Sequence, residues 1–163
     1  HSCPPYSGDG LHKKVFQREV AVFTSTILLR KKALLEAGLF DNTLRRHQDL
    51  QLLLDFTKDH KMNVLNEYLV NLHSDSGINR PSYERLVTIK KDFFRAVAPH
   101  LKLYSKSEQH QIKAAHLFEL AFGAIKEHKW LTALGHILKV GFNIPAYRNL
   151  SKRMKERKYI AEQ

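Results

Sequence analysis

The fold is decided by residues 25–79, which read STILLRKKALLEAGLFDNTLRRHQDLQLLLDFTKDHKMNVLNEYLVNLHSDSGIN. A short run of β-branched, aromatic and apolar residues at 20–29 enters this stretch and predicts a buried strand. Residues 30–37 then follow a short helical pattern that Gly38 closes, because glycine tolerates the left-handed conformation at a helix end. In residues 48–60 the apolar side chains recur with helical spacing and polar residues stand between them, which predicts an amphipathic helix with one buried face.

Two further short strands are expected at residues 62–65 and 68–72, where apolar and β-branched side chains are enriched. Residues 74–81 have the composition of a loop. The sequence up to this point therefore predicts a small α/β unit with a few short strands.

Beyond Pro81 the pattern becomes helical. Ser82 is a suitable N-cap, although Arg85 stands where a capping box would have glutamate. Apolar spacing predicts helices over 83–97, 107–128 and 130–140, and a basic helix follows near 149–159 after Pro145 interrupts the pattern.

The expected fold class is thus α/β and rich in helix. Residues 1–10 form an irregular lead-in, residues 11–80 the small α/β unit, and residues 81–163 a helical extension.

The amino-acid composition limits the classes to which this protein can belong. A hydrophobic fraction of 43% in 163 residues is enough to bury a core, so disorder is not expected. The single cysteine, Cys3, excludes an intrachain disulfide or a four-cysteine zinc site. No apolar run reaches the roughly 18 residues of a membrane span, so we expect a soluble, cytoplasmic chain. A net charge of +11 favours anionic partners.

Asp49 is the residue whose surroundings suggest chemistry. It stands near the start of the helix expected at 48–60, directly after Arg45, Arg46 and His47. Cationic neighbours and the positive end of a helix dipole both favour the ionised carboxylate, which can accept a proton. The simpler alternative is that Asp49 only caps its helix.

The stretch 25–79 resembles the second half of the catalytic domain of inverting family-2 glycosyltransferases, which have the GT-A fold. In that family a strand with small hydroxyl residues leads to a helix and then to a Gly-x-Phe-Asp turn, here residues 38–41. A Gln-Asp motif, Gln48 and Asp49, follows about eight residues later and precedes a hydrophobic helix. The expected strands then end at His73, beside a serine-containing loop.

The resemblance implies roles for named residues. Asp49 would be the general base that deprotonates the acceptor hydroxyl for attack on the anomeric carbon, with inversion. His73 stands where some family members bind the divalent metal or the donor diphosphate, and an exposed or structural histidine is the alternative. The candidate substrate-binding residues are Thr24, Ser25, Arg46, His47 and Gln48. The alternative for Thr24 and Ser25 is that they are hydroxyl residues compatible with the expected strand.

Two departures from the family pattern stand out. Asp55 replaces an arginine that is common in the helix after the motif, so a diphosphate contact from that helix is not expected. Gln48 replaces the commoner glutamate, which leaves the proposed base in place.

The resemblance also implies a nucleotide-sugar donor and a glycan or lipid-linked acceptor, as in cell-envelope polysaccharide synthesis. The family binds the donor and a Mn²⁺ or Mg²⁺ ion through an N-terminal Rossmann-like half with an Asp-x-Asp motif. This chain carries no such motif, so we expect a C-terminal fragment that is inactive alone and holds no metal itself.

The last part of the chain is strongly basic. From residue 101 onward, twelve lysines and arginines stand against five glutamates. A basic amphipathic helix can lie on an anionic membrane, here the inner face of the cell membrane, whereas the alternative is a solvated face on a packed helix. A nucleic-acid-binding module is the competing class, but no zinc knuckle, RNP-like strand or helix-turn-helix supports it, so nucleic acid is not the expected partner.

Overall fold

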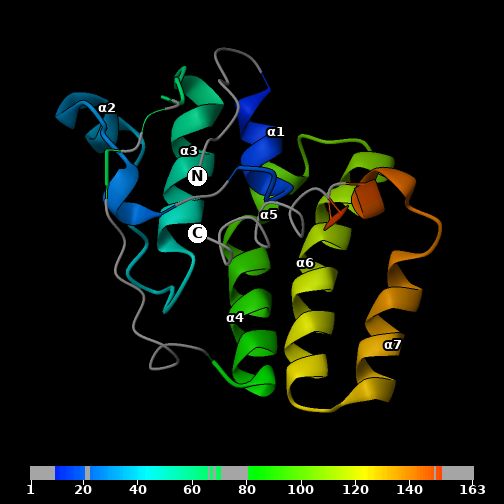
Figure 1. The fold of residues 1–163 in the computed structure, drawn as a ribbon. Helices are drawn as coiled ribbons and strands as arrows, with labels where there is room; N and C mark the ends of the chain where they lie inside the picture. The colour runs from blue at the N-terminus through cyan, green and yellow to red at the C-terminus, as the bar shows by residue number, and fades with distance from the viewer. Residues whose placement is uncertain are drawn as a thin grey trace.

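The computed structural model describes residues 10–20, 23–65, 67, 69–70, 81–148 and 150–151. These ranges contain helices joined by turns and extended segments, and they contain no strand (Figure 1). The helices are α1 (Leu11–Phe16), η1 (Thr24–Thr26, a 3₁₀ turn), α2 (Lys31–Glu36), α3 (Gln48–Asp59), α4 (Tyr83–Ala96), α5 (Ala98–Leu101), α6 (Lys106–Lys126) and α7 (Trp130–Val140). Residues 144–148 and 150–151 are helical too, so Pro145, where a break in the helical pattern was expected, lies in a helical segment.

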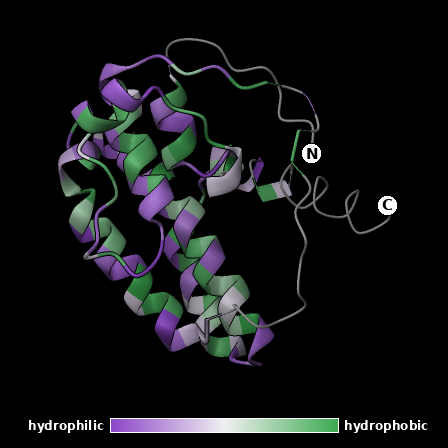
Figure 2. Ribbon diagram, turned by 90° about the vertical axis from the view of Figure 1, so that its left-hand side faces the viewer, coloured by the Kyte–Doolittle hydropathy of each residue, from purple (hydrophilic) through white to green (hydrophobic). Residues whose placement is uncertain are grey.

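Helix α6 lies in the middle of a row, between α4 on one side and α7 on the other (Figure 1). It buries side chains on more than one face, among them Ile112, Phe118 and Leu120. Both of its neighbours are amphipathic, and Figure 2 shows hydrophilic and hydrophobic residues interspersed along the helices. One apolar face is sufficient for an outer helix, whereas a central helix needs two.

The main core joins the two parts of the sequence. Helix α1 packs against α3, and the core cluster that they form also contains side chains from α4 and α6. Its fully buried members are Val15, Phe16, Leu50, Leu54, Phe93, Val97 and Ile112. Phe16 meets Phe93 edge to face with ring centroids 6.3 Å apart. Aromatic pairs of this geometry add roughly 0.5–1.5 kcal/mol beyond the area that they bury.

The N-cap of α4 and the glycine after α2 form as the sequence predicts, and α6 has a cap that was not predicted. The Ser82 hydroxyl accepts the Arg85 N–H, which caps α4. Helix α6 has a complete capping box, in which Ser105 and Glu108 each accept a backbone N–H from the other residue. Gly38 has φ +91 after α2, which only glycine adopts without strain. The helices expected at 30–37, 48–60, 83–97, 107–128 and 130–140 are therefore confirmed.

The predicted α/β fold class is wrong, because the described part of the chain is helical. The strand expected at 20–29 is replaced by the exposed turn η1, after Phe23 and before Ile27, which are extended. Strand preference reflects packing on a pleated surface, and no described segment offers this run a partner strand. Leu28 is consequently 93% exposed.

The strands expected at 62–65 and 68–72 are also wrong where the structure describes them. Residues 61–65 have only an isolated bridge at Asn63, and both Leu65 and Leu69 are exposed. Short apolar runs do not by themselves separate a strand from an extended surface segment. Residues 71–80, with the expected loop and His73, lie outside the described residues, as does most of 149–159.

Candidate functional site

The Asp49 carboxylate lies at the second position of α3, whose N-cap is His47. Its Oδ1 accepts the Leu50 N–H at 2.8 Å, and its Oδ2 accepts the Thr24 hydroxyl at 3.0 Å. Asp49 therefore accepts one of the backbone N–H groups at the start of α3, as the simpler interpretation expected, but it uses only one of its oxygens for this hydrogen bond. Each carboxylate oxygen has a second lone pair, so the group can still accept a substrate proton.

A pocket of about 490 Å³ opens in front of this carboxylate. It is lined by Thr24, Phe40, Arg46, His47, Gln48 and Asp49. Thr24 comes from η1, Phe40 from the turn after α2, Arg46 and His47 from the turn before α3, and the other two from the first turn of α3. Residues that are up to 25 positions apart in sequence thus meet at one opening.

The chain before α3 is shaped by a left-handed residue. His47 has φ +65, a region that histidine adopts more readily than most residues. The Gln48 amide donates to the Leu44 carbonyl at 2.6 Å, which closes the turn around Arg45 and Arg46. This turn fixes the backbone between the two arginines and Asp49.

His47 is neutral at this site. Burial lowers the pKa of its imidazole to about 3, and the nearby charges of Lys90 and Arg18 act in the same direction. The ring lies edge to face against Phe93, with centroids 5.4 Å apart, and its buried Nε2 has no hydrogen-bond partner. His47 therefore contributes shape to the pocket and no positive charge.

The Gly-x-Phe-Asp turn supports the same pocket. Leu39 and Gly38 both have positive φ, so the chain turns sharply before Phe40. The Asp41 Oδ1 accepts the backbone N–H of Thr43 at 2.8 Å and the hydroxyl of the same residue at 2.6 Å. These hydrogen bonds lower the pKa of Asp41, which stays ionised as a turn-forming residue.

Not every predicted site residue joins the pocket. Ser25 lies in η1 with an exposed side chain and lines neither the pocket in front of Asp49 nor the neighbouring pocket described below. His73 lies outside the described residues, so its metal role stays a prediction. The part of the chain that is described brings no three His, Cys, Asp or Glu side chains together as a metal site would require.

Asp55 has a structural partner that the sequence did not reveal. Its Oδ1 accepts a hydrogen bond from His100 Nε2 at 2.6 Å. His100 Nδ1 is in turn hydrogen-bonded to His12 Nε2 at 3.1 Å. This chain of polar groups links α3 to α5 and α1. Asp55 therefore belongs to the helix packing and not to the pocket in front of Asp49.

A second pocket adjoins the first. It has a volume of about 330 Å³ and is lined by Leu44, Arg45, Arg46, Arg85, Thr88, Ile89 and Asp92. Arg46 lines both pockets. Arg45, Arg85 and Phe40 were not predicted as site residues from the sequence. The visible signals were the Arg45–Arg46 pair and the arginine in place of a capping glutamate at position 85.

Comparisons with known proteins add no relative: no protein-family model matches the chain, and no curated protein or solved structure is significantly similar to it. The glycosyltransferase resemblance thus rests on the motif residues alone.

No helix in the described ranges combines the length and the apolar character that crossing a membrane requires.

Proposed function

We propose that this chain carries the acceptor-binding and catalytic-base part of an inverting glycosyltransferase, with Asp49 as the base. The observation that supports the proposal is the pocket in front of Asp49. Five residues that the motif nominated, Thr24, Arg46, His47, Gln48 and Asp49, line this one opening.

The geometry suits proton removal from a hydroxyl. Asp49 is partly exposed to the pocket, and the Thr24 hydroxyl holds one carboxylate oxygen in place from the side. A base of this kind has to lie within hydrogen-bond reach of the proton that it removes, and a positioned base accelerates such steps by about 10²–10⁴-fold. Phe40, which is 41% exposed, offers an aromatic wall against which the apolar face of a sugar ring can pack.

In this mechanism an acceptor hydroxyl donates its proton to Asp49 while its oxygen attacks the anomeric carbon. The bond from that carbon to the diphosphate breaks, and the nucleoside diphosphate leaves from the opposite face of the sugar. The resemblance places the donor and its divalent metal in a separate nucleotide-binding half, with His73 of this chain as a candidate ligand, and the proton transfer uses the carboxylate of Asp49.

The test is transfer by the full-length gene product with a panel of nucleotide-sugars and Mg²⁺ or Mn²⁺. Nuclear magnetic resonance of the product should show the anomeric configuration inverted, and Asp49→Asn should abolish transfer while donor binding is retained. A product with retained configuration, or an Asp49→Asn variant with full activity, would overturn the proposal.

We also propose that α7 rests on an anionic membrane surface. Ala133 and Val140 are buried, and α7 packs against α6. Leu131 and Leu138 are 86% and 71% exposed, and Phe142 beyond the helix is fully exposed. Large apolar side chains on one surface mark an interaction site when they are continuous.

The charge around this surface favours an anionic lipid layer over a second apolar protein face. Lys139 is exposed on α7 itself, Arg148 is exposed further along the chain, and the sequence that follows has five more basic residues between positions 152 and 158. Each basic residue close to an anionic membrane contributes about 1 kcal/mol of binding.

Cosedimentation with vesicles tests this contact. The chain should bind vesicles that contain phosphatidylserine and should bind phosphatidylcholine vesicles much less. Leu131→Ser with Leu138→Ser should release it, whereas Leu28→Ser, which alters a 93% exposed leucine elsewhere, should not. Equal loss in the Leu28 variant, or binding to duplex DNA in place of vesicles, would contradict the membrane proposal.

A further inference from the structure

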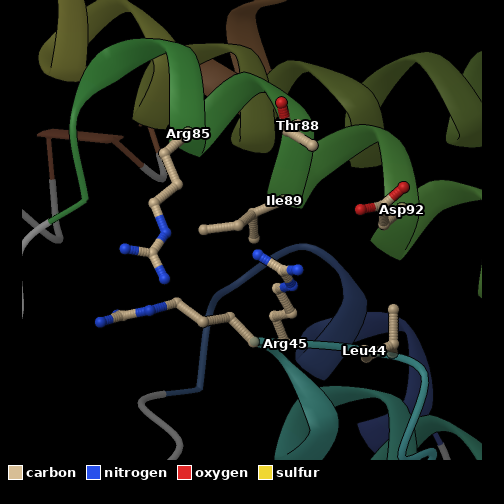
Figure 3. A pocket seen from close by; sticks show the side chains of 7 residues that line it. Leu44, Arg45, Arg85, Thr88, Ile89 and Asp92 are labelled. Atoms are coloured by element: carbon tan, nitrogen blue, oxygen red, sulfur yellow. The ribbon is translucent and has the colours of Figure 1, made fainter.

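The second pocket has an unusual concentration of arginines. Arg85 points from α4 toward the segment that carries Arg45 (Figure 3), and Arg46 completes the wall. Leu44 and Ile89, only 3% and 6% exposed, form an apolar floor. Three exposed arginines thus line one small pocket together with these two buried apolar side chains.

The charge of this pocket specifies its ligand class. Arg45 and Arg85 bring two positive charges to the pocket and Asp92 one negative charge, and Arg46, which also interacts with another group, adds a third guanidinium. Asp92 also accepts Arg95 Nη1 at 3.2 Å, so part of its charge is used outside the arginine group. A phosphate monoester carries a charge of about −1.5 to −2, and guanidinium groups bind phosphate through paired hydrogen bonds. A phosphate offers three oxygens to these guanidinium groups, whereas a carboxylate offers two.

The position of Arg85 goes against local helix preference. It lies in the first turn of α4, where the helix dipole disfavours a cation. The corresponding position of α6 holds Glu108, which completes a capping box. Residues that break a local helix preference with no stabilising contact in return are found mostly at functional sites. Arg45 and Arg46 similarly precede the start of α3, so two helix ends add positive potential here.

We propose that this arginine pocket binds a phosphate group carried by the acceptor whose hydroxyl lies at Asp49. The inference rests on the proposed function for the Asp49 pocket and adds the class of acceptor, a phosphorylated molecule. Arg46 lines both pockets, so one ligand can reach from Asp49 into the arginine pocket.

Stereochemistry separates the acceptor from the donor as the source of the phosphate. In an inverting displacement the attacking hydroxyl and its base lie on one face of the sugar, and the leaving group departs from the other face. The arginine pocket adjoins the base, so it lies on the acceptor side of the reaction. The donor diphosphate belongs on the far face.

The first experiment measures binding of inorganic pyrophosphate, as a phosphate-class probe, to the 163-residue chain by titration calorimetry. Arg45→Gln and Arg85→Gln should each weaken binding by about 10–100-fold, because a hydrogen-bonded charge pair is lost. Arg148→Gln, an exposed arginine near the other end of the chain, and Asp49→Asn should not weaken it. Thermal unfolding of each variant verifies that it is folded.

The second experiment uses the full-length gene product and compares acceptors with and without a phosphate group. Arg85→Gln should raise the KM for the phosphorylated acceptor at least 10-fold and leave the KM for the nucleotide-sugar unchanged. A rise only in the donor KM would assign the pocket to the donor diphosphate and overturn the proposal.

The two proposals can fail separately. If pyrophosphate does not bind, or binds equally well to the Arg45 and Arg85 variants, the arginine pocket is not a phosphate site, whatever Asp49 does. If pyrophosphate binds as expected but Asp49→Asn keeps full transfer activity, the assignment of Asp49 fails, and the acceptor assignment that depends on it fails too.

Discussion

His47 couples the candidate site to the core of the protein. Its imidazole lines the Asp49 pocket on one side and touches Phe93 on the other. The positive charges of Lys90, Arg18 and Arg46 lower its pKa, and the negative charge of Glu119 opposes them only in part. A proton on His47 is therefore unfavourable in the folded state.

The consequence is a loss of stability in acid. The unfolded chain binds a proton at His47 below about pH 6.5, whereas the folded protein does so only near pH 3, so the free energy of unfolding decreases as the pH falls through this range. At pH 5 the protonation of His47 in the unfolded chain lowers the free energy of unfolding by about 2 kcal/mol. Urea unfolding at pH 7 and pH 5 measures it.

The matched variant is His47→Asn, which also tolerates positive φ but does not titrate. It should lose about 2 kcal/mol less stability than the native chain between pH 7 and pH 5. The same loss in both proteins would show that His47 is not held neutral.

At the scale of elements, the glycines of α6 and α7 report how closely the helices approach. A Cβ at Gly123 would lie 3.0 Å from Leu86 Cδ2 on α4, whereas a Cβ at Gly135 would meet nothing within 4 Å. Both positions are inside helices, where glycine costs about 1 kcal/mol relative to alanine.

Gly135→Ala should therefore raise the free energy of unfolding by about 0.5–1 kcal/mol. Gly123→Ala should gain less, because the added methyl group has to displace Leu86. Denaturant unfolding of both variants tests this difference. An equal gain at the two positions would contradict the close packing of α4 on α6.

The elements also show what the sequence could predict. The helices with strong 3.6-residue spacing and clear caps, such as α4 and α6, were predicted within a few residues because those signals are local. The strands were not, because β-branched residues at 20–29 favour a strand only when a neighbouring strand is present. The packing of α1 across α3, α4 and α6 depends on contacts nearly 100 residues apart, which local patterns do not contain.

At the scale of the whole molecule, one buried polar network joins the segment after α1 to α4 and α6. Arg18 donates to Glu119 Oε1 at 3.0 Å, and Lys90 donates to the other oxygen of Glu119 and to His116 Nδ1. Burial alone would raise the pKa of Glu119, but the charges of Arg18 and Lys90 outweigh it and hold the pKa well below its usual value.

Glu119→Gln should destabilise the fold by about 3–5 kcal/mol, because the side chain of Lys90 is only 4% exposed and would lose its counter-ion. Glu36→Gln is the control, since its pair with Lys32 spans 4.0 Å at the surface, where such pairs contribute little. Similar unfolding midpoints for the two variants would mean that the buried network does not hold α1, α4 and α6 together.

The candidate site was predicted in part. The motif around Asp49 predicted most of the residues that line the Asp49 pocket, because they are close in sequence to the start of α3. Arg85 was not nominated, because it reaches the site only through the packing of α4 near the segment before α3. Phe40 belonged to the turn motif, yet only the structure shows that it lines the pocket.

The central claim is that Asp49 removes a proton from the acceptor, and the most direct measurement is kcat of the full-length gene product with Asp49→Asn beside Asp59→Asn. Asp59 lies at the exposed end of the same helix, so its variant controls for the loss of a carboxylate from α3. We predict that kcat falls about 10²–10⁴-fold for Asp49→Asn and hardly changes for Asp59→Asn, with donor binding equal in both. Equal kcat values for the two variants would contradict the assignment of Asp49 as the base.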